Sequence, residues 1–88
     1  MNNGQSKLVA ELMRGLRHER DELELQVHLG SKELQDQWQV LDDKLDALSH
    51  EYEPLKDAVG QTAANVWDSL LLVGSEIRDG FIRVRKAL

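Results

Sequence analysis

The chain has 88 residues with no cysteine and a single proline, and its sixteen acidic and eleven basic residues give a formal net charge of −5. A chain of this length forms at most one domain and buries only a modest share of its apolar surface alone, so we expect a homo-oligomer, most simply a dimer. The net negative charge argues against binding nucleic acid through the overall field, and the lack of cysteine excludes disulfides and thiolate metal sites.

The first residues are polar, and we expect residues 1–6 to be disordered and residues 7–88 to form a single helical domain. The first twenty residues contain no apolar core of the signal-peptide kind. The longest apolar run, residues 70–73, is far too short to span a membrane. We therefore expect a cytoplasmic protein.

A helix is predicted over about residues 7–53, because apolar residues recur there at steps of three and four among good helix formers. Residues 22–29 alternate strictly between polar and apolar types and are followed by Gly30 and Ser31, which is typical of a strand and a turn. A lone strand would need a partner, so we favour the helix. In the helical interpretation Leu25 and Leu29 lie opposite the main apolar stripe, which gives this helix a second apolar face.

Pro54 marks the predicted break, because proline removes a backbone donor and disfavours helical geometry in the residue before it. A second helix over about residues 55–87 would then pack back on the first as a long helical hairpin. The apolar stripe keeps its phase across Pro54, so a single long kinked coiled-coil helix is the alternative. Such a helix would be about 120 Å long, and its broad apolar faces would still need partners.

The distribution of charge predicts how two hairpins would meet. Residues 7–20 and residues 75–88 each carry a net charge of +2, whereas the residues between them carry −9. In a hairpin both basic ends would lie at one pole and the acidic segment at the other, so antiparallel association would pair opposite charges. We therefore expect an antiparallel dimer of hairpins, which is a four-helix bundle.

No group of side chains predicts catalysis, cofactor binding or metal binding. The histidines His18, His28 and His50 lack the one-turn spacing that a metal site on helices needs. The acidic residues between Asp42 and Asp57 lack the alternating ligands and central glycine of a calcium loop. No phosphate-binding glycine loop occurs either. The sequence thus predicts a protein that is not an enzyme.

Two groups of side chains are candidates for binding a partner. A partner helix would contact the second apolar face of the first helix and the broad apolar side of the second helix, together with two tryptophans that we expect to be largely buried. The predicted interface residues are Leu25, Leu29, Val40, Trp38, Trp67, Leu70, Ile77 and Phe81. The C-terminal segment is basic and amphipathic, which is typical of contact with anionic lipid. Its predicted lipid contacts are Arg78, Arg83, Arg85 and Lys86.

Four stretches of the chain resemble small bacterial helical proteins, coiled-coil-like in sequence, that carry no assigned activity. The stretches are 19–23 (ERDEL), 27–29 (VHL), 38–45 (W-x-x-L-x-x-K-L) and 76–88 (EIRDGF-x-x-VRKAL). The resemblance implies an all-helical bacterial protein and assigns no functional residue.

These observations predict a non-catalytic helical interaction or scaffolding protein that works through self-association and by docking a helical protein partner. The apolar faces are the reason, because they exceed what one narrow helix contact would cover. The alternative is an amphipathic protein that binds a membrane or granule surface through its basic C-terminal segment.

Overall fold

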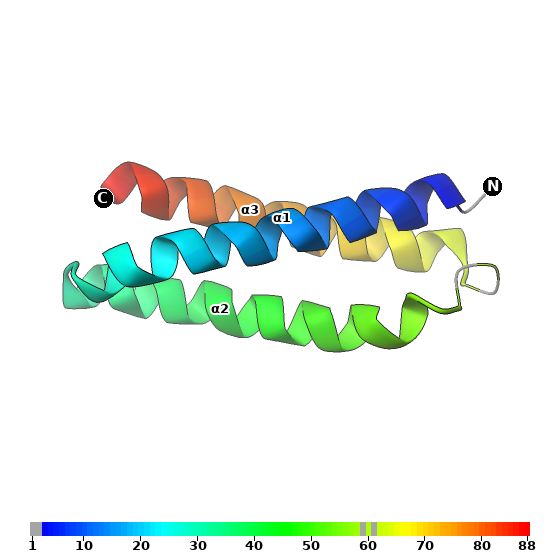
Figure 1. Cartoon of the computed structure of the whole chain (residues 1–88), viewed down its shortest axis with the longest axis horizontal. Coiled ribbons are helices and arrows are strands. Elements are labelled where there is room, and N and C mark those ends of the chain that lie inside the picture. Colours follow the sequence, from blue (N-terminus) through cyan, green and yellow to red (C-terminus); the bar gives the residue numbers. More distant parts are fainter. Residues whose placement is uncertain (1–2, 59, 61) are drawn as a thin grey trace.

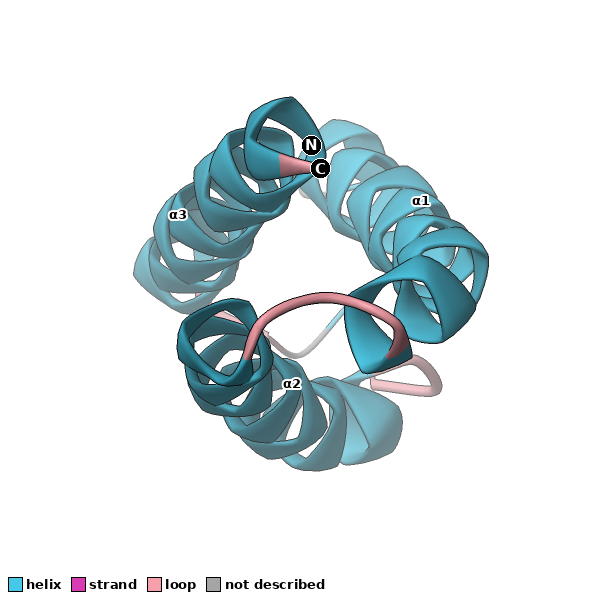
Figure 2. Ribbon diagram, turned by 90° about the vertical axis from the view of Figure 1, so that its left-hand side faces the viewer, coloured by secondary structure: helices cyan, strands magenta, loops and turns pink. Residues whose placement is uncertain are grey.

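The computed structural model describes residues 3–58, 60 and 62–88, and over these residues the chain is all-helical. It contains α1 (Asn3–His28), α2 (Lys32–Tyr52), the short 3-10 helix η1 (Glu53–Leu55) and α3 (Ala64–Ala87). The three long helices lie side by side in an elongated bundle of 44 × 19 × 17 Å (Figure 1). Seen along the bundle, they stand at the corners of a triangle (Figure 2). The prediction of an all-α fold is confirmed for the described part of the chain.

The chain crosses the bundle three times, so α1 and α3 run in the same direction and α2 runs opposite to both (Figure 1). The start of α1 and the end of α3 therefore lie at opposite ends of the bundle. The basic segments 7–20 and 75–88 do not meet at one pole, as the hairpin prediction required. Because the basic segments lie at opposite ends, the distribution of charge no longer favours an antiparallel dimer. A dimer of these three-helix chains would also contain six helices and not four.

The prediction of one continuous helix over residues 7–53 is wrong, because the chain reverses at residues 29–31 and forms α1 and α2 instead. Residues 22–28, for which a strand was the alternative, belong to α1. Helix α1 also begins at Asn3, before the predicted start at residue 7, and residues 1 and 2 lie outside the described residues.

The reversal depends on caps supplied by adjacent residues. The Gly30 amide donates to the Val27 carbonyl at 2.9 Å, and the Ser31 hydroxyl accepts a hydrogen bond from the Leu34 amide at 3.2 Å. The side-chain amide of Gln35 donates to the carbonyl of His28, the last residue of α1, at 3.0 Å and to the carbonyl of Gly30 in the turn at 3.4 Å. A glycine after one helix and a serine N-cap before the next thus satisfy both helix ends within a very short turn.

The connection between α2 and α3 is longer. Helix α2 ends at Tyr52, and Pro54 lies inside η1, where the proline occupies the first turn. The Thr62 hydroxyl then donates to the Ala58 carbonyl at 2.8 Å. Because α3 begins only at Ala64, the second helix starts later than predicted. Residues 59 and 61, which the predicted second helix included, lie outside the described residues.

One apolar core runs along the axis of the bundle between the three helices. Both tryptophans belong to it, as predicted, and Trp38 lies against Phe81 with their ring centroids 5.2 Å apart. On α1 the buried stripe begins at Val9 and not at Leu8, whose side chain is 54% exposed. The core residues on α1 are Val9, Met13, Leu16, Leu23 and Val27; those on α2 are Leu34, Trp38, Leu41, Leu45, Leu48 and Tyr52; those on α3 are Trp67, Leu70, Ile77, Phe81 and Val84.

Two glycines allow α3 to lie close to both neighbouring helices. A Cβ atom at Gly74 would come within 2.5 Å of a terminal methyl group of Leu12 on α1. A Cβ atom at Gly80 would overlap a terminal methyl group of Leu41 on α2. Since both glycines are buried, they are sites of close helix packing.

Candidate functional site

Five of the predicted interface residues, the two tryptophans among them, pack inside the single chain. Trp38, Trp67, Leu70, Ile77 and Phe81 are all buried in the core of the bundle. They present no surface to a second copy, because the apolar faces of the three helices cover one another. This placement corrects the expectation that these five side chains form a contact between chains.

The other three predicted interface residues are exposed, but they do not form one patch. Leu25 is 68% exposed on α1, and Leu29 is 84% exposed at the turn, where it lines a hollow together with Leu88 at the end of the bundle. Val40 is 54% exposed and lines the groove between α2 and α3, beside Arg83. The turn at residues 29–31 separates these side chains, which a continuous helix would have placed on one face.

The predicted lipid contacts are all exposed on α3. They are Arg78, Arg83, Arg85 and Lys86. A guanidinium nitrogen of Arg85 lies 3.4 Å from a carboxylate oxygen of Glu19 and 3.6 Å from one of Glu22, both on α1. Arg83 lines the groove with α2 instead, and Arg78 lines the groove with α1. These arginines therefore spread around α3 and do not share one face.

A largely apolar groove lies between α1 and α3. It has a volume of about 560 Å³. We call it the α1–α3 groove, and its lining residues are Leu8, Glu11, Leu12, Gly15, Leu16, His18, Glu19, Leu71, Ser75 and Arg78. Leu8 is half exposed there, and a Cβ atom at Gly15 would have no neighbour within 4 Å. The groove is thus open and mostly apolar, with a gap at Gly15.

Opposite charges line the two sides of this groove, and Glu11 and Arg78 have no ion pair within the described chain. The carboxylate oxygen Oε2 of Glu19 is buried without a hydrogen-bond partner, while Oε1 lies near Arg85. No described carboxylate lies within ion-pair distance of Arg78. His18 is paired within α1, where its Nε2 lies 2.9 Å from Glu22. Because this carboxylate oxygen is buried, an occupant of the groove would instead meet the exposed charges of Glu11 and Arg78.

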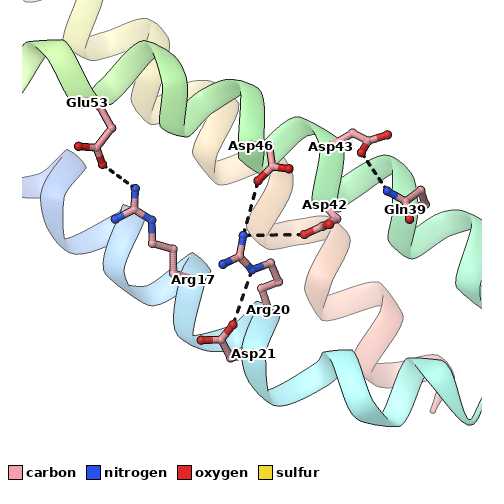
Figure 3. A network of polar contacts seen from close by, with 8 residues as sticks. All are labelled: Arg17, Arg20, Asp21, Gln39, Asp42, Asp43, Asp46 and Glu53. Carbon is pink, nitrogen blue, oxygen red and sulfur yellow. Dashed lines mark hydrogen bonds and ion pairs between the residues drawn. The ribbon is translucent and has the colours of Figure 1, made fainter.

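On the side of α1 that faces α2, ion pairs join the two helices. A guanidinium nitrogen of Arg20 lies 3.9 Å from Asp42 and 3.7 Å from Asp46, and Asp21 approaches the same side chain (Figure 3). Burial raises the pKa of Asp42, and the neighbouring charge of Asp46 raises it further, against the lowering effect of Arg20. One arginine is therefore shared among three carboxylates.

A second ion pair joins α1 to the end of α2. The Arg17 guanidinium lies 3.1 Å from a carboxylate oxygen of Glu53, and the Lys56 ammonium lies 2.9 Å from the other oxygen (Figure 3 shows the arginine). Hydrogen bonds from Lys56 and Arg17 lower the pKa of Glu53. The α1–α2 side is thus polar and internally paired, in contrast to the α1–α3 groove.

Apolar periodicity did not predict the α1–α3 groove, because Leu8 and Leu12 also recur at the three- and four-residue steps of a buried stripe. The neighbouring residues Val9 and Met13 carry that stripe in the structure. The sequence did contain an indication of this groove. Leu8 and Leu12 form one apolar row and Val9 and Met13 form a second row beside it, so the apolar face of α1 is wider than one neighbouring helix can cover.

No set of three or more potential metal-ligating side chains gathers in the described part of the chain. Among the described helices, none is both long enough and apolar enough to cross a membrane. No protein-family model, curated protein or solved structure matches this chain. The proposals below therefore depend on the geometry of this molecule.

Proposed function

We propose that the protein is a non-catalytic helical interaction module that acts by self-association and by docking helices in the α1–α3 groove. The observation that carries this proposal is the groove itself, where Leu8, Leu12 and Leu71 are incompletely covered by the chain's own helices. A helix laid over two neighbouring helices buries such side chains, which is the arrangement of helix bundles.

The shape of the surface supports helix docking over small-molecule binding. The groove is open along its length, and its lining residues repeat at one-turn intervals on α1, from Leu8 through Leu12 to Glu19. Burying the exposed leucines would be favourable by about 25 cal/mol for each Å² removed from water.

Self-association is tested by analytical ultracentrifugation over a wide range of protein concentration. We expect the wild-type chain to form dimers and the variant Leu8→Asp to shift the equilibrium toward monomer, because a carboxylate in an apolar contact is costly. Leu25→Asp is the matched control, since Leu25 lies on the same helix outside the groove. Both variants should keep the helical circular dichroism of the wild type. A wild-type chain that remains monomeric at millimolar concentration would contradict the proposal.

A membrane- or granule-surface function is the alternative. It is supported by the exposed apolar residues Leu72 and Ile82 on α3, the same helix as Arg83 and Lys86. Flotation with anionic vesicles distinguishes the two functions. Salt-sensitive binding that is lost in Arg83→Glu would favour the lipid surface over helix docking.

A further inference from the structure

We propose that a second copy of this chain occupies the α1–α3 groove, with the two bundles side by side and pointing in the same direction. The twofold axis of this dimer would run parallel to the bundles. The inference rests on the proposed self-association and specifies its geometry, which differs from the antiparallel dimer predicted from the sequence.

The relative heights of residues on α1 and α3 follow from two contacts. The Gln5 side chain hydrogen-bonds to Asp68, and Leu12 packs against Gly74. The first contact joins residues 63 positions apart, and the second has nearly the same separation. Because the two helices are parallel, residues with this separation lie at the same height along the bundle (Figure 1).

A rotation about a twofold axis parallel to the bundle places α1 of one copy against α3 of the other. This rotation does not change the position of any residue along the bundle axis. Leu8 then meets Leu71 of the partner subunit, because these two positions are level in the groove. By the same rule, Arg78 of the partner subunit lies over Gly15. The space above Gly15 is open, since a Cβ atom there would have no neighbour within 4 Å.

Charge complementarity selects this orientation. Glu11 and Glu19 lie one helical turn before and after Gly15, so the partner's Arg78 would come between two carboxylates. Glu11 is exposed and has no ion pair among the described residues, and Arg78 has no carboxylate within ion-pair distance there either, so both charges are available to a second copy. An antiparallel dimer through the same faces would stack α1 on α1 and α3 on α3. It would set the carboxylates of α1 against each other and the arginines of α3 against each other.

The size of the face and the position of α2 agree with this dimer. A face of 44 × 19 Å has an area of roughly 800 Å², about what each partner buries in an interface of standard size. Helix α2 carries six carboxylates against two lysines, and it occupies the third corner of the triangle, away from the groove (Figure 2). Association through α1 and α3 therefore keeps the two acidic helices apart.

The test reverses one charge on each side of the proposed contact. In a homodimer of Glu11→Arg the new arginine faces the partner's Arg78, and in Arg78→Glu the new glutamate faces the partner's Glu11. We expect each variant alone to dimerise roughly tenfold more weakly than the wild type, because the change repeats at both symmetric contacts. Neither side chain has an ion pair within the described chain, so both variants should keep the wild-type circular dichroism.

Mixing the two variants should restore most of the wild-type dimerisation, because both contacts between positions 11 and 78 again join opposite charges, and only the contact between Glu19 of one chain and the new glutamate at position 78 of the other joins like charges. Arg83→Glu is the control. Because Arg83 lies in the other groove, this variant should dimerise like the wild type on its own, and mixing it with Glu11→Arg should not bring the association of the Glu11→Arg chain back to the level reached with Arg78→Glu. Sedimentation equilibrium measures each dissociation constant. If the wild type dimerises but charge reversal has no effect, or the mixture stays dissociated, this geometry is wrong although self-association stands.

Spin labels provide a second measurement of orientation. The chain has no native cysteine, so Asn65→Cys allows a single label near the start of α3. Two labels in the proposed dimer lie at the same end, much closer than the 44 Å bundle length. A label-to-label distance near 44 Å would instead mean an antiparallel dimer. A wild-type chain that remains monomeric would overturn both the geometry and the proposed function.

Discussion

Replacing Gly80 by alanine tests the close packing of α3 against α2. The added Cβ atom would overlap one terminal methyl group of Leu41 and lie 3.0 Å from the other and 3.2 Å from Cγ. The whole branched end of Leu41 would have to move. Since Leu41 is buried among core side chains, the movement would displace other residues too.

Two effects of opposite sign decide the outcome. Alanine is favoured over glycine inside a helix by about 1 kcal/mol. Overpacking a well-filled core costs about 1–3 kcal/mol. We expect the overpacking to prevail at Gly80 and to lower the free energy of unfolding by about 1 kcal/mol, which corresponds to a fall in Tm of about 4–8 °C for a chain of this size.

Gly15→Ala is the matched control, because its Cβ atom would meet nothing within 4 Å. This variant should gain up to about 1 kcal/mol from helix propensity alone. Urea unfolding followed by circular dichroism measures both changes, and repetition at two protein concentrations separates them from any effect on association. If Gly80→Ala were stabilised as much as Gly15→Ala, α3 would not pack as closely on α2 as the structure indicates.

Three further predictions concern the turn, the core and the shared arginine. Ser31→Ala should lower the free energy of unfolding by about 1 kcal/mol through loss of the N-cap of α2, and urea unfolding would show no change if the cap were unimportant. Leu45→Ala should cost about 2–5 kcal/mol in the same assay, because Leu45 is fully buried, and a loss below 1 kcal/mol would contradict its place in the core. Asp42→Asn should stabilise the protein at pH 7, because the raised pKa of Asp42 means that folding favours the neutral carboxyl. This gain should shrink as the pH falls toward the ordinary aspartate value of 3.8 and vanish below it, and a gain that stayed the same at low pH would contradict the raised pKa of Asp42.

The sequence predicts the helical class and the burial of the tryptophans well, because both follow from apolar periodicity. It does not reveal the turn between α1 and α2, and the reason is geometric. Val27 and Leu34 stand about two helical turns apart, so the apolar stripe keeps its phase across Gly30 and Ser31 as if the helix continued. Only the cap residues Gly30 and Ser31 indicate the break between α1 and α2. Because a glycine followed by a serine is also tolerated inside a helix, these two residues do not predict the break by themselves.

The wide apolar face of α1 indicated an extra contact, but the position of the α1–α3 groove did not follow from it, because that position depends on the number of helices. With two helices per chain, the apolar side of the second helix would need a partner chain, and residues such as Ile77 would be interface residues. In the three-helix bundle, α1 and α2 cover that side of α3 within the same chain. On α1 the leucine left exposed for a partner is Leu8, which is adjacent to the buried Val9. Packing, and not periodicity alone, decides which of these two adjacent residues faces the core.

The parallel course of α1 and α3 makes the bundle a spacer. Whatever is attached before α1 and after α3 is held apart by about the length of the molecule, 44 Å, whereas a two-helix hairpin would bring both attachments together (Figure 1). A donor and an acceptor fluorophore fused to the two ends would therefore report the folded state by a fixed transfer efficiency lower than that of a two-helix hairpin, and shortening the three helices by matched turns would raise it stepwise.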